Sequence, residues 1–273
     1  MSVAAPTTSS DALALLGDDP ELHVLAGGTD LMVEVNFDRL RLGGVVSLHR
    51  LHELRSYEQR DGKVRVGAGT TCTMLEAADL AATTPALAQA ARTVGSPQIR
   101  NAATIGGNLA TASPAGDLLP VLSALDATIH CAHRDGTRAV PIHDFLVGPK
   151  RNALRAGELI TAVEFETSHQ QQEFVKVGTR NAMVIAVVSV AAVRTDSTIR
   201  IALGSVGPTV IRARVAEDWL AERGLDPAAS DEFGARVAAE SRPIDDHRAT
   251  ADYRRHAVRI CAARVARRLL AGN

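Results

Sequence analysis

The sequence predicts a protein of mixed helices and strands divided into three parts. Its 273 residues exceed the usual size of a single domain, about 100 to 150 residues. Apolar residues make up 46% and charged residues 22%, both near globular averages, so a disordered or fibrous chain is excluded. Strand and helix patterns alternate in the first third, whereas the last third has strands and helices of its own. We expect an α/β part over 1–57, an α+β part over 58–170 and another over 171–273.

Charge and cysteine content exclude several classes of protein. The 30 Lys and Arg nearly balance the 31 Asp and Glu, so no overall field draws the chain to nucleic acid or anionic lipid. Cys72, Cys131 and Cys261 lie far apart, which excludes a disulfide framework or a metal-cluster ligand set within this chain. The longest apolar stretch, 182–193, is shorter than the roughly 18 residues of a membrane span. We therefore expect a cytoplasmic protein with no secretory signal and no transmembrane segment.

The first part reads as helices and strands in alternation. Ser9 or Ser10 can cap a helix over 11–16, and the apolar residues 23–26 predict a strand. After a Gly-Gly pair, Thr29 or Asp30 is a plausible cap for a second helix. A further strand is predicted over 45–48. The next, over 64–69, is entered through an Asp-Gly turn and opens the middle part.

After that strand, the middle part has two predicted helices, 74–82 and 85–93. Thr84 and Pro85 suit the cap and first position of the second helix, where the missing proline N–H costs nothing. We expect residues 101–120 to be irregular, because they hold three glycines and two prolines. A hairpin is predicted from 127–132 to 138–141 and a strand over 159–166.

The last part has predicted strands at 173–177, 184–193 and 199–203. Two helices are expected, over 211–223 and 251–270. The second helix has apolar or aromatic residues at steps of four, from Tyr253 to Leu269, and Gly272 is a suitable stop.

Familiar catalytic motifs are absent from the sequence. There is no nucleophile elbow, zinc-protease motif or P-loop, and His130 and His133 would point to opposite faces of one strand. We predict no catalytic side chain and no metal site. Gly67-Ala68-Gly69 begins like a dinucleotide fingerprint, but Cys72 stands where the third glycine belongs. A free-standing nicotinamide-dependent reductase therefore remains only an alternative.

Two glycine pairs give a stronger indication of a ligand. Gly27-Gly28 joins an apolar strand to a helix start, and Gly106-Gly107 is flanked by Thr104 and Asn108. Glycine lets a backbone approach a ligand closely, and N–H and hydroxyl groups donate to phosphate oxygens. Each pair alone could be a tight turn. Together, two loops poor in charge but rich in donors suit a dinucleotide whose pyrophosphate is held by backbone.

The sequence around these glycines resembles the FAD-binding subunits of the molybdenum hydroxylases, as in carbon monoxide dehydrogenase and xanthine dehydrogenase. The resemblance covers nearly the whole chain in the family's order. Its carriers are Ala26-Gly27-Gly28-Thr29-Asp30-Leu31, Gln98-Ile99-Arg100-Asn101, Thr104-Ile105-Gly106-Gly107-Asn108, Ser113-Pro114-Ala115-Gly116-Asp117, residues 145–149, 157–160 and 174–180, and Pro243-Ile244-Asp245-Asp246-His247-Arg248 leading into Tyr253-Arg254-Arg255.

The resemblance implies a fold and a set of FAD contacts. The fold would be a two-part FAD-binding unit, small α/β then α+β, followed by a three-stranded antiparallel sheet with helices. Backbone N–H groups of 24–31 and 104–108 would hold the phosphates, Asp117 a hydroxyl of the adenosine ribose, and Lys176 would lie near the isoalloxazine. The complete implied set is Val24, Leu25, Ala26, Gly27, Gly28, Thr29, Asp30, Leu31, Gly95, Thr104, Ile105, Gly106, Gly107, Asn108, Ser113, Asp117, Leu159, Ile160 and Lys176.

The resemblance also implies a division of labour. FAD would be bound noncovalently, since position 29 is Thr and not His. A large partner subunit would carry molybdopterin and a small one two [2Fe-2S] clusters, in a dimer of heterotrimers. This chain would relay electrons from the clusters to an external acceptor. A scaffold subunit that kept the fold but lost the cofactor is a further alternative.

Overall fold

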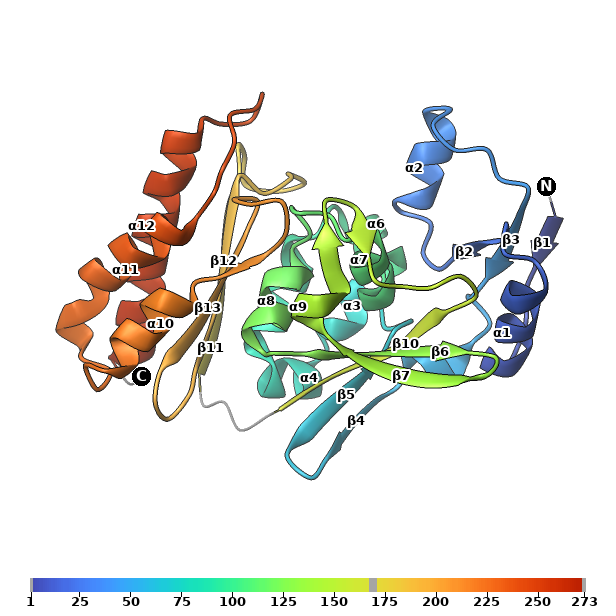
Figure 1. Cartoon of the computed structure of the whole chain (residues 1–273), viewed down its shortest axis with the longest axis horizontal. Helices are drawn as coiled ribbons and strands as arrows, with labels where there is room; N and C mark the ends of the chain where they lie inside the picture. The colour runs from blue at the N-terminus through green and yellow to red at the C-terminus, as the bar shows by residue number, and fades with distance from the viewer. Residues whose placement is uncertain (1, 167–170, 272–273) are drawn as a thin grey trace.

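The computed structural model describes residues 2–166 and 171–271, which form three main sheets in chain order, each with helices packed beside it, and one two-stranded ribbon (Figure 1). The first sheet is parallel, with strand order β1 (Ser2–Ala4), β3 (Gly44–Ser47) and β2 (His23–Leu25). Helices α1 (Ser9–Asp18) and α2 (Leu31–Asn36) lie between these strands in the chain, as parallel neighbours require a crossover.

The predicted elements of this first part are present, with one change of cap. Helix α1 begins at Ser9, and its cap is Thr8, whose hydroxyl accepts a hydrogen bond from the N–H of Asp11 at 3.1 Å. The expected Ser9 and Ser10 caps are therefore wrong. Asp30 occupies the cap position of α2 but makes no capping hydrogen bond with its side chain. Its carboxylate is directed elsewhere, toward Thr111.

The second sheet is antiparallel throughout. Its order is β4 (Tyr57–Arg60), β5 (Lys63–Gly67), β10 (Leu159–Glu166), β6 (Thr128–His133) and β7 (Gly136–Pro141). Both predicted turns form hairpins here, since Asp61 and Gly62 adopt φ of 52° and 74° and the β6–β7 pairing closes at His133 and Gly136. The short 3-10 helix η1 (His52–Arg55) precedes β4.

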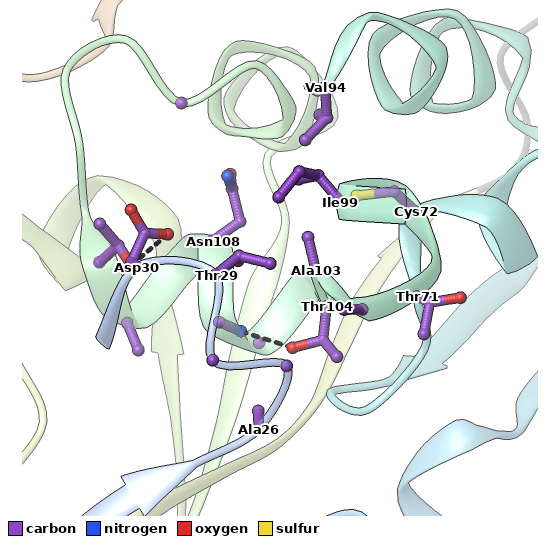
Figure 2. Close-up of a pocket in the computed structure, with 18 of the residues that line it drawn as sticks. Ala26, Thr29, Asp30, Thr71, Cys72, Val94, Ile99, Ala103, Thr104 and Asn108 are labelled. Carbon is purple, nitrogen blue, oxygen red and sulfur yellow. Dashed lines mark hydrogen bonds between the residues drawn. The ribbon is translucent and has the colours of Figure 1, made fainter. Parts of the chain in front are cut away.

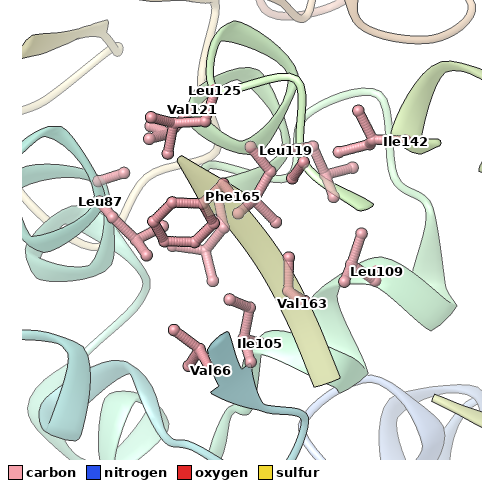
Figure 3. Close-up of a cluster of buried hydrophobic side chains, with 14 of the residues drawn as sticks. Val66, Leu87, Ile105, Leu109, Leu119, Val121, Leu125, Ile142, Val163 and Phe165 are labelled. Atoms are coloured by element: carbon pink, nitrogen blue, oxygen red, sulfur yellow. The ribbon is translucent and has the colours of Figure 1, made fainter. Parts of the chain in front are cut away.

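Short helices cover one face of this sheet and form the largest core with it. They are α3 (Cys72–Leu75), α4 (Ala78–Thr83), α5 (Pro85–Thr93), α6 (Pro97–Ala102), α7 (Ile105–Thr111), α8 (Leu118–Ala124) and α9 (Ile142–Phe145), with the ribbon β8 (Leu146–Gly148) and β9 (Arg151–Asn152) after them. Figure 3 shows Val163 and Phe165 of β10 among leucines and isoleucines from these helices. Ile105 and Leu109 of α7 are completely buried there.

Two expectations for the middle part are wrong. Residues 101–120 are mostly helical, because Pro120 lies in the first turn of α8, where an N–H is not needed, and Gly106 lies within α7. The predicted helix 74–82 is broken at Ala77, whose backbone is extended. Leu75 and Leu80, one on each side of the break, are both buried in the core. Helix α5 spans Pro85–Thr93 as predicted.

The C-terminal sheet is antiparallel and buried on both faces. Its three long strands are β11 (Gln171–Val177), β12 (Val188–Arg194) and β13 (Ile199–Gly204), with a two-residue β14 (Ile211–Arg212) at the edge. Ala191 and Val193 pack on the middle part, while Val190 and Ala192 pack on the C-terminal helices. Burial on both faces explains the long apolar run in this sequence.

Three helices cover the outer face of that sheet: α10 (Arg214–Ala221), α11 (Ser230–Glu240) and α12 (Ala251–Leu270), with η2 (Pro227–Ala229) before α11. Helix α12 has the predicted bounds, but α11 was not foreseen. The predicted strand 184–193 begins only at Val188, and the predicted helix 211–223 begins at Arg214 because β14 occupies its start. The expected boundary at 170 and stop at Gly272 lie outside the described residues, and the division at 57 remains a prediction.

The C-terminal sheet is joined to the middle part by hydrogen bonds from alternate residues of β11. The N–H of Phe174 donates to Gln89 Oε1 at 2.7 Å, and Lys176 Nζ donates to the carbonyl of Thr93 at 3.1 Å. Both acceptors lie on α5. A backbone donor at residue 174 and a side-chain donor at residue 176 therefore fix β11 against α5 at two points.

Candidate cofactor-binding site

A cavity of about 920 Å³ is lined by residues from all three parts of the chain. Its walls include residues 24 and 26–31 from the N-terminal part, the ends of α6 and α7 from the middle part, and Met183, Val184 and Ile185 from the loop between β11 and β12. Figure 2 shows Ala26, Thr29 and Asp30 facing Ala103, Thr104 and Asn108. The volume lies at the upper end of the range for ligand pockets, about 300 to 1,000 Å³.

The first glycine segment combines a close backbone approach with free donors. A Cβ on Gly27 would lie 1.8 Å from the carbonyl oxygen of Ala102, so only glycine fits against the end of α6. Gly28 has φ of +71°, which glycine adopts readily. The N–H groups of Gly27, Gly28, Thr29 and Asp30 donate to no acceptor within residues 2–166 and 171–271. Four successive donors on a cavity wall suit a polyanionic ligand.

The second glycine segment, at the start of α7, has its donors already engaged. The N–H groups of Ile105 and Gly106 donate to the carbonyls of Thr70 and Ala68 at 3.0 and 2.9 Å. The N–H of Gly107 donates to the hydroxyl oxygen of Thr104, also at 3.0 Å. This segment therefore offers the cavity the Thr104 hydroxyl proton and a surface without side chains, but no free N–H in its first turn.

Asn108 and Ser113 carry the neutral polar side chains beside this segment. The Asn108 side-chain oxygen is buried and has no hydrogen-bond partner in the described residues. Ser113 Oγ accepts a long bond, 3.3 Å, from the N–H of Ala115 and still has its proton to donate. A buried acceptor without a partner costs free energy, so Asn108 fits a site that a donor on a ligand completes.

Asp117 and Lys176 form a buried ion pair at the cavity wall. Lys176 Nζ lies 2.6 Å from Asp117 Oδ2, and both side chains are 8% exposed. Burial raises the pKa of Asp117, and the ammonium of Lys176 opposes that rise. The second carboxylate oxygen is buried without a partner in the described chain. Because the two side chains touch, Asp117 and Lys176 cannot serve opposite ends of an extended ligand.

Most of the expected site residues line this cavity. The exceptions are Leu25, Ile105 and Lys176. Leu25 packs beneath Gly28, Ile105 belongs to the core, and Lys176 reaches the cavity only through Asp117. The others that line it are Val24, Ala26, Gly27, Gly28, Thr29, Asp30, Leu31, Gly95, Thr104, Gly106, Gly107, Asn108, Ser113, Asp117, Leu159 and Ile160.

Several lining residues have no signal in the sequence. Arg55 is the one Lys or Arg that the described cavity wall includes, and its guanidinium donates to the carbonyl of His49 at 2.7 Å. Cys72 also faces the cavity, and burial, assisted by the charge of Asp117, raises its thiol pKa to about 12. Met183 has φ of +52° and reaches the cavity from a loop that no motif marks.

The glycines of the dinucleotide-like pattern, Gly67 and Gly69, are required for packing within the chain. Cβ atoms on Gly67 and Gly69 would lie 2.4 and 3.0 Å from the carbonyl oxygen of Leu54. The N–H of Gly69 also donates to that oxygen at 2.7 Å. These glycines allow the end of β5 to pack against η1, so they do not form a second nucleotide site.

Two kinds of feature are absent from the described residues. No group of three or more His, Cys, Asp or Glu side chains there could hold a metal ion. None of the helices in those residues combines the length and apolar character needed to cross a membrane. Cys72, Cys131 and Cys261 are all free and buried.

Comparison with known proteins identifies both halves of the chain. Residues 1–165 match the FAD binding domain in molybdopterin dehydrogenase, and residues 173–269 match the CO dehydrogenase flavoprotein C-terminal domain. The chain is 32% identical to the xanthine dehydrogenase FAD-binding subunit of Escherichia coli O157:H7 over 268 residues, which cover 94% of this chain and 92% of that one.

Solved structures with the same fold are also found. The quinoline 2-oxidoreductase of Pseudomonas putida 86 superposes with a TM-score of 0.93 at 27% identity, covering 100% of this chain and 97% of the other. The carbon monoxide dehydrogenase of Hydrogenophaga pseudoflava, in a form that lacks the Mo-pyranopterin moiety of its molybdenum cofactor, gives 0.91 at 27% identity, with coverages of 99% and 98%.

Proposed function

Because the chain belongs to the FAD-binding subunits of the molybdenum hydroxylase family, we propose that it relays electrons within an oxidoreductase complex. It would take them from [2Fe-2S] clusters on a small partner subunit and pass them to an external acceptor. A large partner would hold molybdopterin and oxidise the substrate, and the complex would be a dimer of heterotrimers in the cytoplasm. Three free cysteines support a reducing compartment.

One observation carries the assignment of FAD to the cavity. The N–H groups of residues 27–30 line it with no acceptor in the described chain, while Asn108 and Asp117 each place a buried, unpartnered oxygen at the same site. The donors suit the pyrophosphate, and the acceptors suit sugar or ribityl hydroxyls. A dinucleotide supplies both kinds of group, whereas inorganic phosphate supplies only the first.

The residues then take the following roles. Residues 27–30 would hold the pyrophosphate by backbone donors, with the Thr29 hydroxyl as an additional one. Asp117 would accept a hydrogen bond from a hydroxyl of the cofactor, and Lys176 would serve as its buried counter-ion. Leu159 and Ile160, which are almost fully buried, would provide the apolar surface for adenine. When bound, FAD accepts and releases electrons at its isoalloxazine, and the protein contributes placement and polarity.

A visible spectrum of the purified chain tests this function first. We expect flavin bands, release of FAD on heating, and renewed uptake when FAD is added to the emptied protein. Gly107→Val should lose this uptake, because its side chain would enter the cavity, whereas Gly43→Ala should bind normally, since a Cβ there meets no atom within 4 Å. A colourless wild-type chain that takes up no FAD would contradict the proposal and favour a scaffold role.

The electron relay needs a test in the assembled complex. In a complex carrying the Gly107→Val subunit, substrate should still reduce the iron-sulfur clusters of the partner. Reduction of the external acceptor should fail, and adding FAD should not restore it. Normal transfer to the acceptor in that FAD-free complex would show that electrons leave by another route.

A further inference from the structure

Arg254 is a buried cation that does not line the cavity. Its hydrogen bonds, however, reach two segments that continue into the cavity walls. It lies in the first turn of α12, and its side chain is only 2% exposed. Helix α12 packs on the outer face of the C-terminal sheet, away from the middle part (Figure 1). The residue belongs to the segment 243–255, which carries the family resemblance but contributes nothing to the cavity lining.

The guanidinium of Arg254 holds two backbone carbonyls at once. One nitrogen donates to the carbonyls of Val187 and Ser205, each at 2.8 Å. Another donates to Asp246 Oδ1 at 2.7 Å. That carboxylate is fixed in turn by the N–H groups of Arg248 and Ala249. Burial alone would raise the pKa of Asp246, but these bonds and the guanidinium lower it to about 2, so the pair stays charged at neutral pH.

Each carbonyl belongs to a segment that ends at the cavity. Val187 closes the loop between β11 and β12, because its N–H donates to the carbonyl of Val177 at 2.8 Å. That loop places Met183, Val184 and Ile185 on the cavity wall. The Arg180 side chain donates to the carbonyl of Met183 within the loop. Arg254 therefore fixes the stem of this wall.

The second branch crosses from the C-terminal sheet to the middle part. Ser205, with φ of +63°, donates its N–H to the carbonyl of Pro114 at 2.8 Å. Pro114 lies between Ser113 and Ala115, which line the cavity in the same loop as Asp117. Arg254 holds the carbonyl of Ser205, and the N–H of the same residue supports the second wall. Arg254 therefore fixes the residue on which this wall depends.

We propose that Arg254 is a positioning residue of the cofactor site, which sets the wall at 183–185 and the wall at 113–117 relative to each other without touching the cofactor. The inference rests on the proposed FAD function. A planar guanidinium can donate in several fixed directions, which a compact ammonium cannot reproduce. Loss of Arg254 should therefore loosen both walls together.

A matched control is available in Arg212, another buried arginine of the C-terminal part. Its side chain is 6% exposed and donates to both oxygens of Glu217 at 2.7 Å, to Asp126 at 2.6 Å and to the carbonyl of Ser123 at 2.9 Å. It does not line the cavity or contact either wall. Arg212→Met should cost as much thermal stability as Arg254→Met, but through contacts that do not hold those walls.

The experiment compares FAD binding by the full-length chain and its variants, followed by flavin fluorescence. We expect Arg254→Met to raise the Kd for FAD at least about tenfold, equivalent to about 1.4 kcal/mol, and Arg212→Met to change it less than about twofold. Amide hydrogen exchange should become faster at 113–117 and 178–187 in the Arg254 variant, with 230–240 unchanged. Arg254→Lys should give an intermediate Kd, and it carries the test if Arg254→Met does not fold.

Two results would overturn the inference. One is a folded Arg254 variant with wild-type Kd and wild-type exchange at both walls. The other is an Arg212 variant that raises the Kd as much as the Arg254 variant for the same loss in Tm, since this would show a general effect of destabilisation. If the wild-type chain takes up no FAD, the proposed function fails and this inference fails with it, whereas wild-type binding with unaffected variants removes only the role of Arg254.

Discussion

The two glycine pairs of this chain look alike in sequence but meet different physical demands. Both precede or open a short helix and both line the same cavity. At Gly27-Gly28 the neighbouring N–H groups have no acceptor in the part of the chain that the structure describes, whereas the corresponding groups at the start of α7 are bonded to Ala68, Thr70 and Thr104. The first pair thus exposes donors to a ligand, and the second allows a helix to pack on a strand end.

The difference shows what a glycine pair can and cannot indicate. Glycine is needed wherever a Cβ would collide, and the collision can be with the protein itself. Gly106 illustrates this, because a Cβ there would lie 2.7 Å from the Cβ of Ala68. Only the hydrogen-bond partners of the adjacent N–H groups distinguish a ligand cradle from a packing contact.

The largest effect is expected at Gly27. Gly27→Ala would bring a Cβ to 1.8 Å from the carbonyl of Ala102, so the donor segment must move away from α6. Loss of two charge-assisted bonds at about 1.5 kcal/mol each raises the Kd for FAD about 100-fold. Titration of the variant with FAD measures this. A Cβ on Gly28 would meet only the side chains of Leu25 and Met32, at 3.2 and 3.4 Å, so Gly28→Ala adds the strain of a side chain at φ of +71°, about 1 to 2 kcal/mol, without a backbone collision. Its effect should therefore be smaller; equal effects at both positions would show that the collision with Ala102 is not the cause.

Two single substitutions in α7, at Gly106 and at Gly107, test whether packing and ligand binding separate within one glycine pair. Gly106→Ala should lower the free energy of unfolding by about 1 to 3 kcal/mol, because its Cβ collides with Ala68. Gly107→Ala meets only the Thr104 hydroxyl, at 3.0 Å, and should leave stability within about 1 kcal/mol. Denaturant unfolding separates the two, and FAD titration should show the larger affinity loss for Gly107→Ala. If both variants lose stability equally, the packing role assigned to Gly106 is wrong.

Local sequence patterns predicted the bounds of some helices as the structure has them and missed other helices altogether. Helices α5 and α12 have the predicted bounds, because each has a threonine at the cap position and an uninterrupted apolar stripe. Helices α6, α7 and α8 were missed because Pro97, Gly106 and Pro120 disrupt helices in isolation. In the fold the prolines occupy first turns and the glycine meets a strand end, which only tertiary contacts reveal.

The site residues were likewise predictable only where a local sequence pattern marks them. The motif-bearing segments around Gly27 and Thr104 could be found from sequence, since their residue types indicate phosphate binding. Arg55 and Met183 could not, because no motif marks them and only the fold brings them to the cavity. Arg254 lies in a segment that carries the resemblance, but its bonds to Val187 and Ser205, 67 and 49 residues away, are visible only in the fold. Lys176 was expected to contact the cofactor directly, but the cavity wall contains its partner Asp117 instead.

An intermediate effect on FAD affinity is expected from substituting Asn108. The oxygen of this side chain in α7 lacks a partner in the described chain. Asn108→Leu removes that acceptor without breaking a side-chain hydrogen bond in the described residues, so the free energy of unfolding should stay constant or rise. The Kd for FAD should rise about tenfold if the cofactor donates to this oxygen. Calorimetric titration alongside thermal unfolding checks both. Unchanged affinity would leave the second glycine segment with a purely structural role.

The smallest effects are expected from the two threonines, and they should have opposite signatures. Thr104 caps α7 through its hydroxyl oxygen, so Thr104→Ala should cost about 1 kcal/mol of stability. Thr29 makes no side-chain hydrogen bond in the described residues, so Thr29→Ala should leave stability unchanged while raising the Kd for FAD several-fold. Thr29→Ser, which keeps the hydroxyl, should bind like wild type. If Thr29→Ala binds FAD normally while Thr104→Ala does not, the free donors of the first segment do not mark the phosphate site, and the roles assigned to the two loops must be exchanged.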